Sequence, residues 1–457
     1  MDATDLDHRA RTRSGCIPPE LVSRLLERGH ADVVEQQAGR GEWFCALAWA
    51  RLLGERARQA DACEVLAPYL ATGWWTAVVA AAELLEGWGR VDEAIEITRV
   101  RVEAGHPMAL EFYTRLLARH GRAEEAFALL RPHIGELSLA TALVDVAAAA
   151  GRHEEAAALL APRAEHECSD FPWCCRGLSR DMTTGLLATL LERQGRVDEA
   201  IALLHTDRTT TIDHREQLAA LLARHGRLDE LRAAAAADDS WDAVRQLAGL
   251  LEERGDVEGA VAAYRQAVES TVHAHHAASE QARLLARHGR GGEAIEMLRV
   301  QTGLQTGLRT GLRTGDDRIL HALSDLCLDQ GRPHDGLVHL DAFATVHGGE
   351  EDWESYRLRL RLIAARDGVD EAIARARSHP EGRTSYAAQY VAELLTGAGR
   401  IEEAVVVLEQ HAPANSHDLA ACLIDLGRVE DALAVLERHT PRQAGQPDGR
   451  WRDESPF

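Results

Sequence analysis

Lysine is absent from the sequence and asparagine occurs once, at Asn415, so all 51 basic residues are arginines. This absence excludes several enzyme classes that need a lysine: P-loop nucleotidases with a G-x-x-x-x-G-K motif, protein kinases, and pyridoxal enzymes that form a Schiff base. Aromatic residues are also scarce, at 5% of the chain, although hydrophobic residues make up 46%. We therefore expect a core of leucine, valine and alanine, a composition that suits closely packed helices.

Long hydrophobic runs are missing as well. The first 15 residues contain no apolar stretch of the kind found in secretory signals. Nowhere do about 18 apolar residues follow one another, as a membrane-spanning helix requires. The eight cysteines lack the spacing of a disulfide framework, and several lie in apolar helical runs. These features predict a cytoplasmic protein with reduced thiols and no membrane contact.

Residues 186–204, LLATLLERQGRVDEAIALL, have the pattern of two helices joined by a turn. Gly195 stands where the first helix ends, because glycine readily adopts the left-handed conformation that ends helices. Asp198 and Glu199 fall in the first turn of the second helix, where carboxylates complement the positive end of the helix dipole. Ala200 then begins an apolar stripe.

The same pattern recurs along the chain. Between Gly29 and Gly427 the chain advances 398 residues in 12 intervals of about 33 residues, the period of helix–turn–helix repeats. The first two anchor positions match the pattern poorly, and the others match it well. The 13 anchors are Gly29, Gly54, Gly89, Gly121, Gly151, Gly195, Gly226, Gly255, Gly289, Gly331, Asp367, Gly399 and Gly427.

Small residues and leucine recur at fixed distances from the anchor. An alanine stands five residues after the anchor and a small residue stands seven residues before the anchor, and both allow the two helices to approach closely. A leucine four residues before the anchor fills the space between the helices. The alanines after the anchor are Ala94, Ala126, Ala156, Ala200, Ala260, Ala294, Ala372, Ala404 and Ala432. Such a unit cannot bury its apolar face alone, so the repeats are predicted to stack.

These motifs resemble the tetratricopeptide repeat (TPR), whose turn is commonly Gly-Asp-Tyr-Asp-Glu-Ala. The likeness covers about residues 17–438 and departs from the family at its aromatic positions, where leucine replaces tyrosine and only Trp43 falls near the family's tryptophan. Residues 102–117 look like the Sel-like variant, and residues 398–410 are similar to a pentatricopeptide repeat. The resemblance implies an all-α, right-handed helix-pair solenoid of about 13 repeats, whose first helices line a concave, partner-binding face.

Several segments depart from the repeat. Residues 167–180 lengthen one interval to 44 residues. Residues 302–315 are a four-residue tandem repeat with glycine, which costs about 1 kcal/mol in a helix, so we expect an exposed mobile loop. The ends, 1–16 and 439–457, are expected to be disordered. Within the array, the first two units, to about residue 88, are atypical.

The cysteines of the first insert are the strongest candidates for a metal site. Cys168, Cys174 and Cys175 are ligand types that suit zinc, but adjacent cysteines are awkward in one tetrahedral site. We prefer the interpretation that the insert folds back with Phe171 and Trp173 as an apolar plug.

Two weaker patterns are also interpreted as structural. His273, His275 and His276 lack the i,i+4 spacing of a two-histidine metal motif, so they are expected to be surface histidines. Gly289 and Gly291 imitate a dinucleotide fingerprint, but the preceding residues predict a helix where that motif needs a strand. We therefore expect no cofactor, no metal and no catalytic site.

Partner contacts are expected from arginines near the ends of first helices and from tryptophans. Five of the nine tryptophans lie within 46 residues, and large rings often anchor interfaces. Both groups have a structural alternative: arginine at a helix C-terminus complements the dipole, and the rings can fill the core of a terminal cap. The candidate residues are Arg119, Arg193, Arg224, Arg287, Trp43 and Trp49.

The end of the array carries a second candidate interface. Val429, Ala432, Val435 and Leu436 form an apolar stripe that no later helix follows. Solenoid ends need a polar cap, so we expect either the C-terminal tail or a second subunit, in a homodimer through a terminal repeat, to cover it.

The favoured function is a cytoplasmic, non-enzymatic scaffold or adaptor for a protein or peptide partner. The alternative is a receptor that binds a small ligand or peptide and changes curvature. Binding of single-stranded RNA in the pentatricopeptide manner is disfavoured by the net charge of −22, because phosphate backbones attract basic surfaces.

Overall fold

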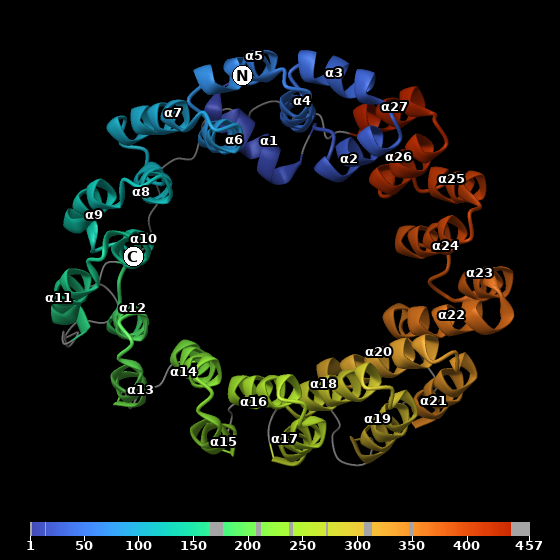
Figure 1. The fold of residues 1–457 in the computed structure, drawn as a ribbon. Coiled ribbons are helices and arrows are strands. Elements are labelled where there is room, and N and C mark those ends of the chain that lie inside the picture. Colours follow the sequence, from blue (N-terminus) through green and yellow to red (C-terminus); the bar gives the residue numbers. More distant parts are fainter. Residues whose placement is uncertain are drawn as a thin grey trace, which may run out of the picture. The chain divides into compact units, whose positions relative to one another are not determined.

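The computed structural model describes residues 2–13, 15–164, 177–206, 212–236, 241–270, 273–305, 313–346 and 351–439. Within these ranges the regular elements are 27 α-helices and one short 3₁₀ turn, with no strand. Helix α1 (Ala3–Thr12) precedes 13 consecutive helix pairs (Figure 1). The predicted all-α array of helix pairs is confirmed.

Each pair consists of a first and a second helix. The first helices are α2 (Pro19–Glu27), α4 (Trp43–Glu55), α6 (Trp75–Gly87), α8 (Ala109–Arg119), α10 (Leu137–Ala150), α12 (Arg180–Arg193), α14 (Ile212–Arg224), α16 (Trp241–Glu253), α18 (Ala274–Arg287), α20 (Arg313–Asp329), α22 (Trp353–Asp367), α24 (Ser385–Gly397) and α26 (Ser416–Asp425). The second helices are α3 (Ala31–Gly39), α5 (Gln59–Ala71), α7 (Val91–Glu103), α9 (Ala123–Leu130), α11 (His153–Ala164), α13 (Val197–Thr206), α15 (Leu228–Ala236), α17 (Val257–Ser270), α19 (Gly291–Gln305), α21 (Pro333–Val346), α23 (Val369–Ser378), α25 (Ile401–Glu409) and α27 (Val429–His439).

The chain divides into two compact units. Unit 1 consists of Met1–Ile97 together with Ala376–Phe457, and unit 2 of Thr98–Arg375. Unit 1 therefore combines the first and the last repeats of the array. Unit 2 contains the repeats from α8 to α22, in which most of the consecutive first helices pack side by side.

A buried carboxylate joins the two ends of the chain inside unit 1, where α2 packs against α26. Asp425 of α26 has a side chain only 5% exposed. It accepts hydrogen bonds from Arg24 Nη1 at 2.6 Å and from Arg28 Nε at 3.0 Å, both contributed by the α2 repeat. We call this arrangement the Asp425 clasp.

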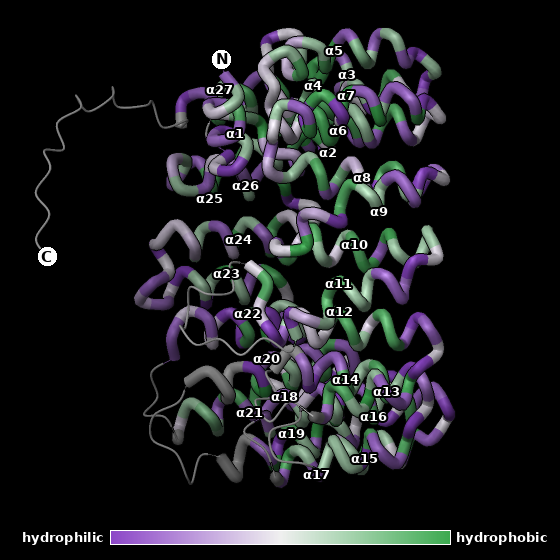
Figure 2. Tube along the Cα trace, turned by 90° about the vertical axis from the view of Figure 1, so that its left-hand side faces the viewer, coloured by the Kyte–Doolittle hydropathy of each residue, from purple (hydrophilic) through white to green (hydrophobic). Residues whose placement is uncertain are grey.

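The alanines five residues after the anchors belong to the core of the array. All nine alanines predicted there are fully buried, at 0% exposure. The leucines four residues before the anchor are buried as well, except Leu191, which is half-buried. In Figure 2, hydrophobic and hydrophilic stretches alternate along the helices, as expected when each helix buries one face.

Anchor glycines end the first helices with a positive φ, for example 76° at Gly195, as predicted. Two anchors were placed wrongly. Gly54 lies inside α4, and Ala57, with φ 60°, makes the turn instead. In the eleventh repeat the turn residue is Gly368, with φ 99°, because a single residue separates the two helices there, whereas two or three separate them in the other pairs.

The acidic pair of each repeat has a second role besides complementing the helix dipole. The arginine after the anchor binds the acid three residues later in its own repeat, as Arg196 does with Glu199 at 2.6 Å. In three repeats this arginine also reaches the acid of the preceding repeat. The pairs between repeats are Arg152–Glu124, Arg227–Asp198 and Arg290–Glu258. At these three places the charges link neighbouring repeats.

Two of the predicted irregular segments are corrected. Within the segment 1–16, predicted to be disordered, Ala3–Thr12 form helix α1, which Asp2 caps and in which Leu6 is buried. Part of the loop predicted at 302–315 is helical, because α19 continues to Gln305 and α20 begins at Arg313, and residues 306–312 lie outside the described residues. A glycine costs a helix only about 1 kcal/mol, which the rest of a long helix can offset. Residues 165–176, with most of the cysteine insert, and 440–457 lie outside the described residues.

None of the described helices combines the length and the apolarity needed to cross a membrane.

We expect Gly54→Ala to destabilise unit 1 by about 1–3 kcal/mol, the usual result of overpacking. A Cβ at Gly54 would lie 2.6 Å from the Trp88 ring. Gly249, inside α16, is the matched control, because a Cβ there would have no neighbouring atom within 4 Å. Gly249→Ala should stabilise the protein by about 1 kcal/mol through helix propensity. Urea unfolding measures both changes, and an equal effect of the two substitutions contradicts the steric account.

Candidate functional site

Three of the arginines predicted to contact a partner connect neighbouring first helices. Arg193 donates to the Val144 carbonyl at 2.7 Å and to Asp145 at 2.9 Å. Arg224 makes two hydrogen bonds, of 2.9 and 2.8 Å, to Glu192 of the preceding repeat. These contacts are a structural role other than the predicted interaction with the helix dipole, and partner binding by these arginines stays a prediction.

The same arrangement recurs two repeats later. Arg287 donates to Glu252 at 3.2 and 2.8 Å, and His288 Nε2 lies 3.0 Å from the same carboxylate. Arg119 is the last residue of α8 and is exposed. A partner-binding role for Arg119 stays a prediction.

Trp43 and Trp49 do not offer their rings to a partner, because both are buried. The Trp43 ring packs edge-on against Tyr69 and Trp74, with ring centroids 5.0 and 4.7 Å apart. Trp74 Nε1 donates to Asp7 of α1 at 3.3 Å. The expectation of partner contacts from Trp43 and Trp49 is therefore corrected: the rings fill the core of the first repeats, and α1 covers them.

No group of three metal-ligating side chains occurs in the part of the chain that the structure describes. Cys168, Cys174 and Cys175 lie outside that part. His273 and His276 are half-buried beside Trp241, with ring centroids 6.3 and 5.8 Å from it. They are half-exposed and belong to an aromatic cluster, in addition to lying at the surface as expected.

The apolar stripe at the end of the array is buried without a second subunit. Val429, Ala432 and Val435 of α27 are each less than a tenth exposed within the single chain. Leu436 is half-buried and lines a cavity shared with the N-terminal repeats. The chain's own first repeats thus take part in covering the stripe. The homodimer and a role for the tail stay predictions.

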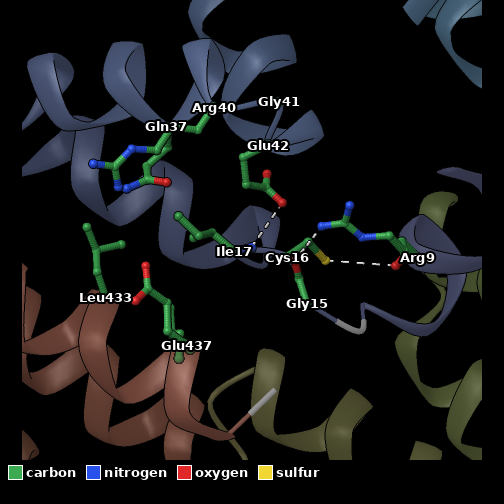
Figure 3. A pocket seen from close by; sticks show the side chains of 11 residues that line it. Arg9, Gly15, Cys16, Ile17, Gln37, Arg40, Gly41, Glu42, Leu433 and Glu437 are labelled. Carbon is green, nitrogen blue, oxygen red and sulfur yellow. Dashed lines mark hydrogen bonds between the residues drawn. The ribbon is translucent and has the colours of Figure 1, made fainter. Parts of the chain in front are cut away.

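This cavity in unit 1 has a volume of about 220 Å³ (Figure 3). Helix α3 contributes Gln37, and the turn that follows it contributes Arg40. Helix α27 contributes Leu433 and Glu437, which lie four residues apart and share a face. Figure 3 shows the side chains from the two helices facing each other across the cavity. The repeat pattern does not predict this site, because its residues come from opposite ends of the sequence.

Glu42 fixes one wall of the cavity. Its carboxylate accepts hydrogen bonds from the backbone N–H groups of Ile17 at 3.2 Å and Phe44 at 2.9 Å, which ties the loop after α1 to the start of α4. Burial raises the pKa of Glu42 above its usual range, although these N–H groups act to lower it. Cys16 lies in the same loop, and burial raises the pKa of its thiol to about 11. The thiol therefore stays protonated near neutral pH and is a poor nucleophile.

Gln37 carries an unusual buried donor. Its side chain is 7% exposed, and its Nε2 has no hydrogen-bond partner among the described residues. A buried donor without a partner costs about 1–3 kcal/mol. The cavity wall therefore contains a polar group that the protein itself does not satisfy.

A second hollow, of about 460 Å³, lies in unit 2 between the first helices α10, α12 and α14. Gln217 Nε2 donates to the Gly185 carbonyl at 2.8 Å and to Thr189 Oγ1 at 3.1 Å, which gives the hollow a fixed polar wall. His214, 3% exposed, has Nε2 2.7 Å from the Asp181 carbonyl. Because a carbonyl only accepts, Nε2 carries the proton, and Nδ1 of the neutral ring is an acceptor. Nδ1 has no partner within the described part of the chain.

We expect Glu192→Gln to lower stability at neutral pH and to have less effect in acid. Partial burial acts to raise the pKa of Glu192, but the hydrogen bonds and charges of Arg224 and His225 outweigh it and leave the pKa below its usual value. A carboxyl group whose pKa is lower in the folded than in the unfolded protein stabilises the fold at pH values above its unfolded-state pKa of about 4.3. This stabilisation is lost as the pH falls through the folded-state pKa.

Urea unfolding at several pH values between about 7 and 3 measures this dependence. Glu253→Gln is the control, because Glu253 is exposed and has no ion pair among the described residues. If the loss caused by Glu192→Gln is the same at every pH, the ion pairs do not contribute as described.

No family model and no curated protein matches the chain. Among solved structures, a Naa15/Naa10 complex bound to HypK-THB matches 91% of this chain and 74% of that chain, at 15% identity and a TM-score of 0.41. The match to the pentatricopeptide repeat protein PPR10 from maize covers 97% of this chain and 64% of that chain, at 16% identity and a TM-score of 0.37. The match to the TPR-like repeats of a putative kinesin light chain from Podosopora anserina covers 47% of this chain and 96% of that chain, at 21% identity and a TM-score of 0.23.

The architecture is established by the helix pairs themselves, with their left-handed glycine turns and buried alanine contacts. The chain is a helical-repeat protein built from stacked helix pairs.

Proposed function

We propose that the chain is a non-enzymatic scaffold that binds a protein partner through an extended peptide segment on the first helices of unit 2. The observation that carries this proposal is the hollow between α10, α12 and α14, where the buried His214 Nδ1 lacks a donor among the described residues. A peptide backbone supplies N–H donors at regular intervals, and one of them would satisfy this nitrogen. The volume of about 460 Å³ lies within the range of ligand sites.

The other walls of the hollow suit a peptide side chain. Met182 is exposed there, and the flexible thioether of methionine adapts to different apolar partners. Leu137 and Leu186 add apolar surface, while Ser179 and Thr189 bring hydroxyl groups. An apolar surface with a few fixed polar groups is typical of specific recognition.

The charges of the chain favour a peptide over RNA. Arg193, Arg224 and Arg287 are engaged by carboxylates or a carbonyl of the preceding first helix. Phosphate recognition would have to break these pairs, on a chain whose net charge is −22.

A ligand-responsive receptor is the second candidate function. The observation that favours it is the cavity in unit 1, where the buried Gln37 amide lacks a partner within the described residues.

The proposal is tested with peptides selected against the full chain from a random displayed library. We expect peptides that bind with micromolar affinity and lose at least tenfold, about 1.4 kcal/mol, on Met182→Glu. His214→Phe, which removes the acceptor, should also weaken them. Fluorescence anisotropy of labelled peptides measures the affinities.

Val300→Glu is the matched control, because Val300 is exposed on the second helix α19 of the same unit. Selected peptides that bind wild type, Met182→Glu and Val300→Glu equally well would show that the hollow is not the site. Saturable binding of single-stranded RNA at low salt would favour nucleic-acid recognition instead.

A further inference from the structure

The cavity of unit 1 presents opposite charges on its two sides. Arg40 beside α3 and Glu437 of α27 both line it, and neither has an ion-pair partner within the described residues. In Figure 3 the Glu437 carboxylate faces the side chains of Gln37 and Arg40 across the cavity. The two charges are therefore placed to meet a ligand that carries both signs.

The neutral part of the lining is aliphatic. Ile17 is buried beneath the cavity, and Leu433 and Leu436 of α27 are half-buried at its edge. Burial of an aliphatic side chain here contributes about 25 cal/mol per Å² of apolar surface removed from water. The volume of about 220 Å³ is below the range of about 300–1,000 Å³ for drug-sized ligands, so the ligand is a small molecule.

The unsatisfied amide decides which group faces α3. Gln37 Nε2 is a donor that is buried and has no partner among the described residues. An oxygen of a carboxylate would accept from it while the same carboxylate pairs with the guanidinium of Arg40, which follows the end of α3 and lines the same cavity. Glu437, on the other side, would then receive an ammonium group.

We propose that this cavity binds a small zwitterion with an aliphatic side chain, of the class of free α-amino acids such as leucine. Its carboxylate pairs with Gln37 and Arg40, its ammonium with Glu437, and its side chain packs against Ile17, Leu433 and Leu436. This site is in unit 1 and is independent of peptide binding in unit 2.

A bound ligand of this kind would also link the first repeats to the last helix. The lining residues belong to the N-terminal segment and to α27, which unit 1 brings together. A molecule that binds only this folded arrangement stabilises it by mass action. Binding is therefore measurable as an increase in the melting temperature of the protein and also as a heat of binding in calorimetry.

Isothermal titration calorimetry of the full chain with L-leucine tests the proposal. We expect saturable binding of one molecule per chain. Two analogues separate the charges: 4-methylpentanoate lacks the ammonium group, and 3-methylbutylamine lacks the carboxylate. Each should bind at least tenfold more weakly than leucine. No heat of binding at millimolar leucine, or equal binding of either analogue, overturns the proposal.

Substitutions test which residues bind the carboxylate and which bind the ammonium group of the ligand. Gln37→Leu and Glu437→Gln should each weaken leucine binding at least tenfold. Their controls are Gln36→Leu and Glu430→Gln, exposed positions on the same two helices that do not line the cavity, which should stay within twofold of wild type. Equal effects of the variants and their controls contradict the assignment.

The melting temperature separates loss of binding from loss of folding. Gln37→Leu removes an unsatisfied buried donor, so without ligand it should melt at or above the wild-type temperature. If it unfolds instead, Gln37→Glu is the second variant, because it keeps the size of the side chain and repels the ligand carboxylate. Unweakened leucine binding by folded Gln37→Glu overturns the proposal.

Discussion

The structure depends on the close approach of the two helices of each pair, and alanine makes that approach possible. Every alanine predicted at the contact, from Ala94 to Ala432, is fully buried. A larger side chain at such a position would overpack the contact, which typically costs about 1–3 kcal/mol. Because one pair cannot bury its remaining apolar face, the repeats must stack. The scarcity of aromatic residues follows from the same constraint, since small and aliphatic side chains fill the narrow space between helices.

Many charges of the repeats pair with one another, either within one repeat or between neighbouring repeats. The arginine after the turn pairs with its own repeat, as Arg196 does with Glu199, and some arginines also reach the preceding repeat. Arg224 and Arg287 connect first helices in the same way. Arginine suits these contacts because its planar guanidinium donates two parallel hydrogen bonds to one carboxylate. Groups that recur in nearly every repeat are therefore weak evidence for a functional site.

The sequence predicts features that local periodicity determines, and it misses those that depend on distant contacts. The buried alanines, the acidic helix starts and the 13 pairs all follow from spacing within one repeat. The sequence pattern places the turn of the second repeat at Gly54, because glycine usually ends these helices. In the structure Ala57 makes this turn, and Gly54 leaves room for the Trp88 ring. The cavity at Gln37 was not predictable, since α3 and α27 are separated by almost the whole sequence. Likewise, Arg24 and Asp425 are 401 residues apart.

The Asp425 clasp brings the first and last repeats together and so creates the cavity between α3 and α27. A double-mutant cycle between Arg24 and Asp425 tests this central claim most directly, with urea unfolding followed by the fluorescence of the tryptophans in unit 1. If α2 and α26 pack as described, Arg24→Ala and Asp425→Ala are not additive, and their coupling free energy is about 0.5–3 kcal/mol. Strict additivity of the two substitutions would contradict the clasp, and with it the cavity.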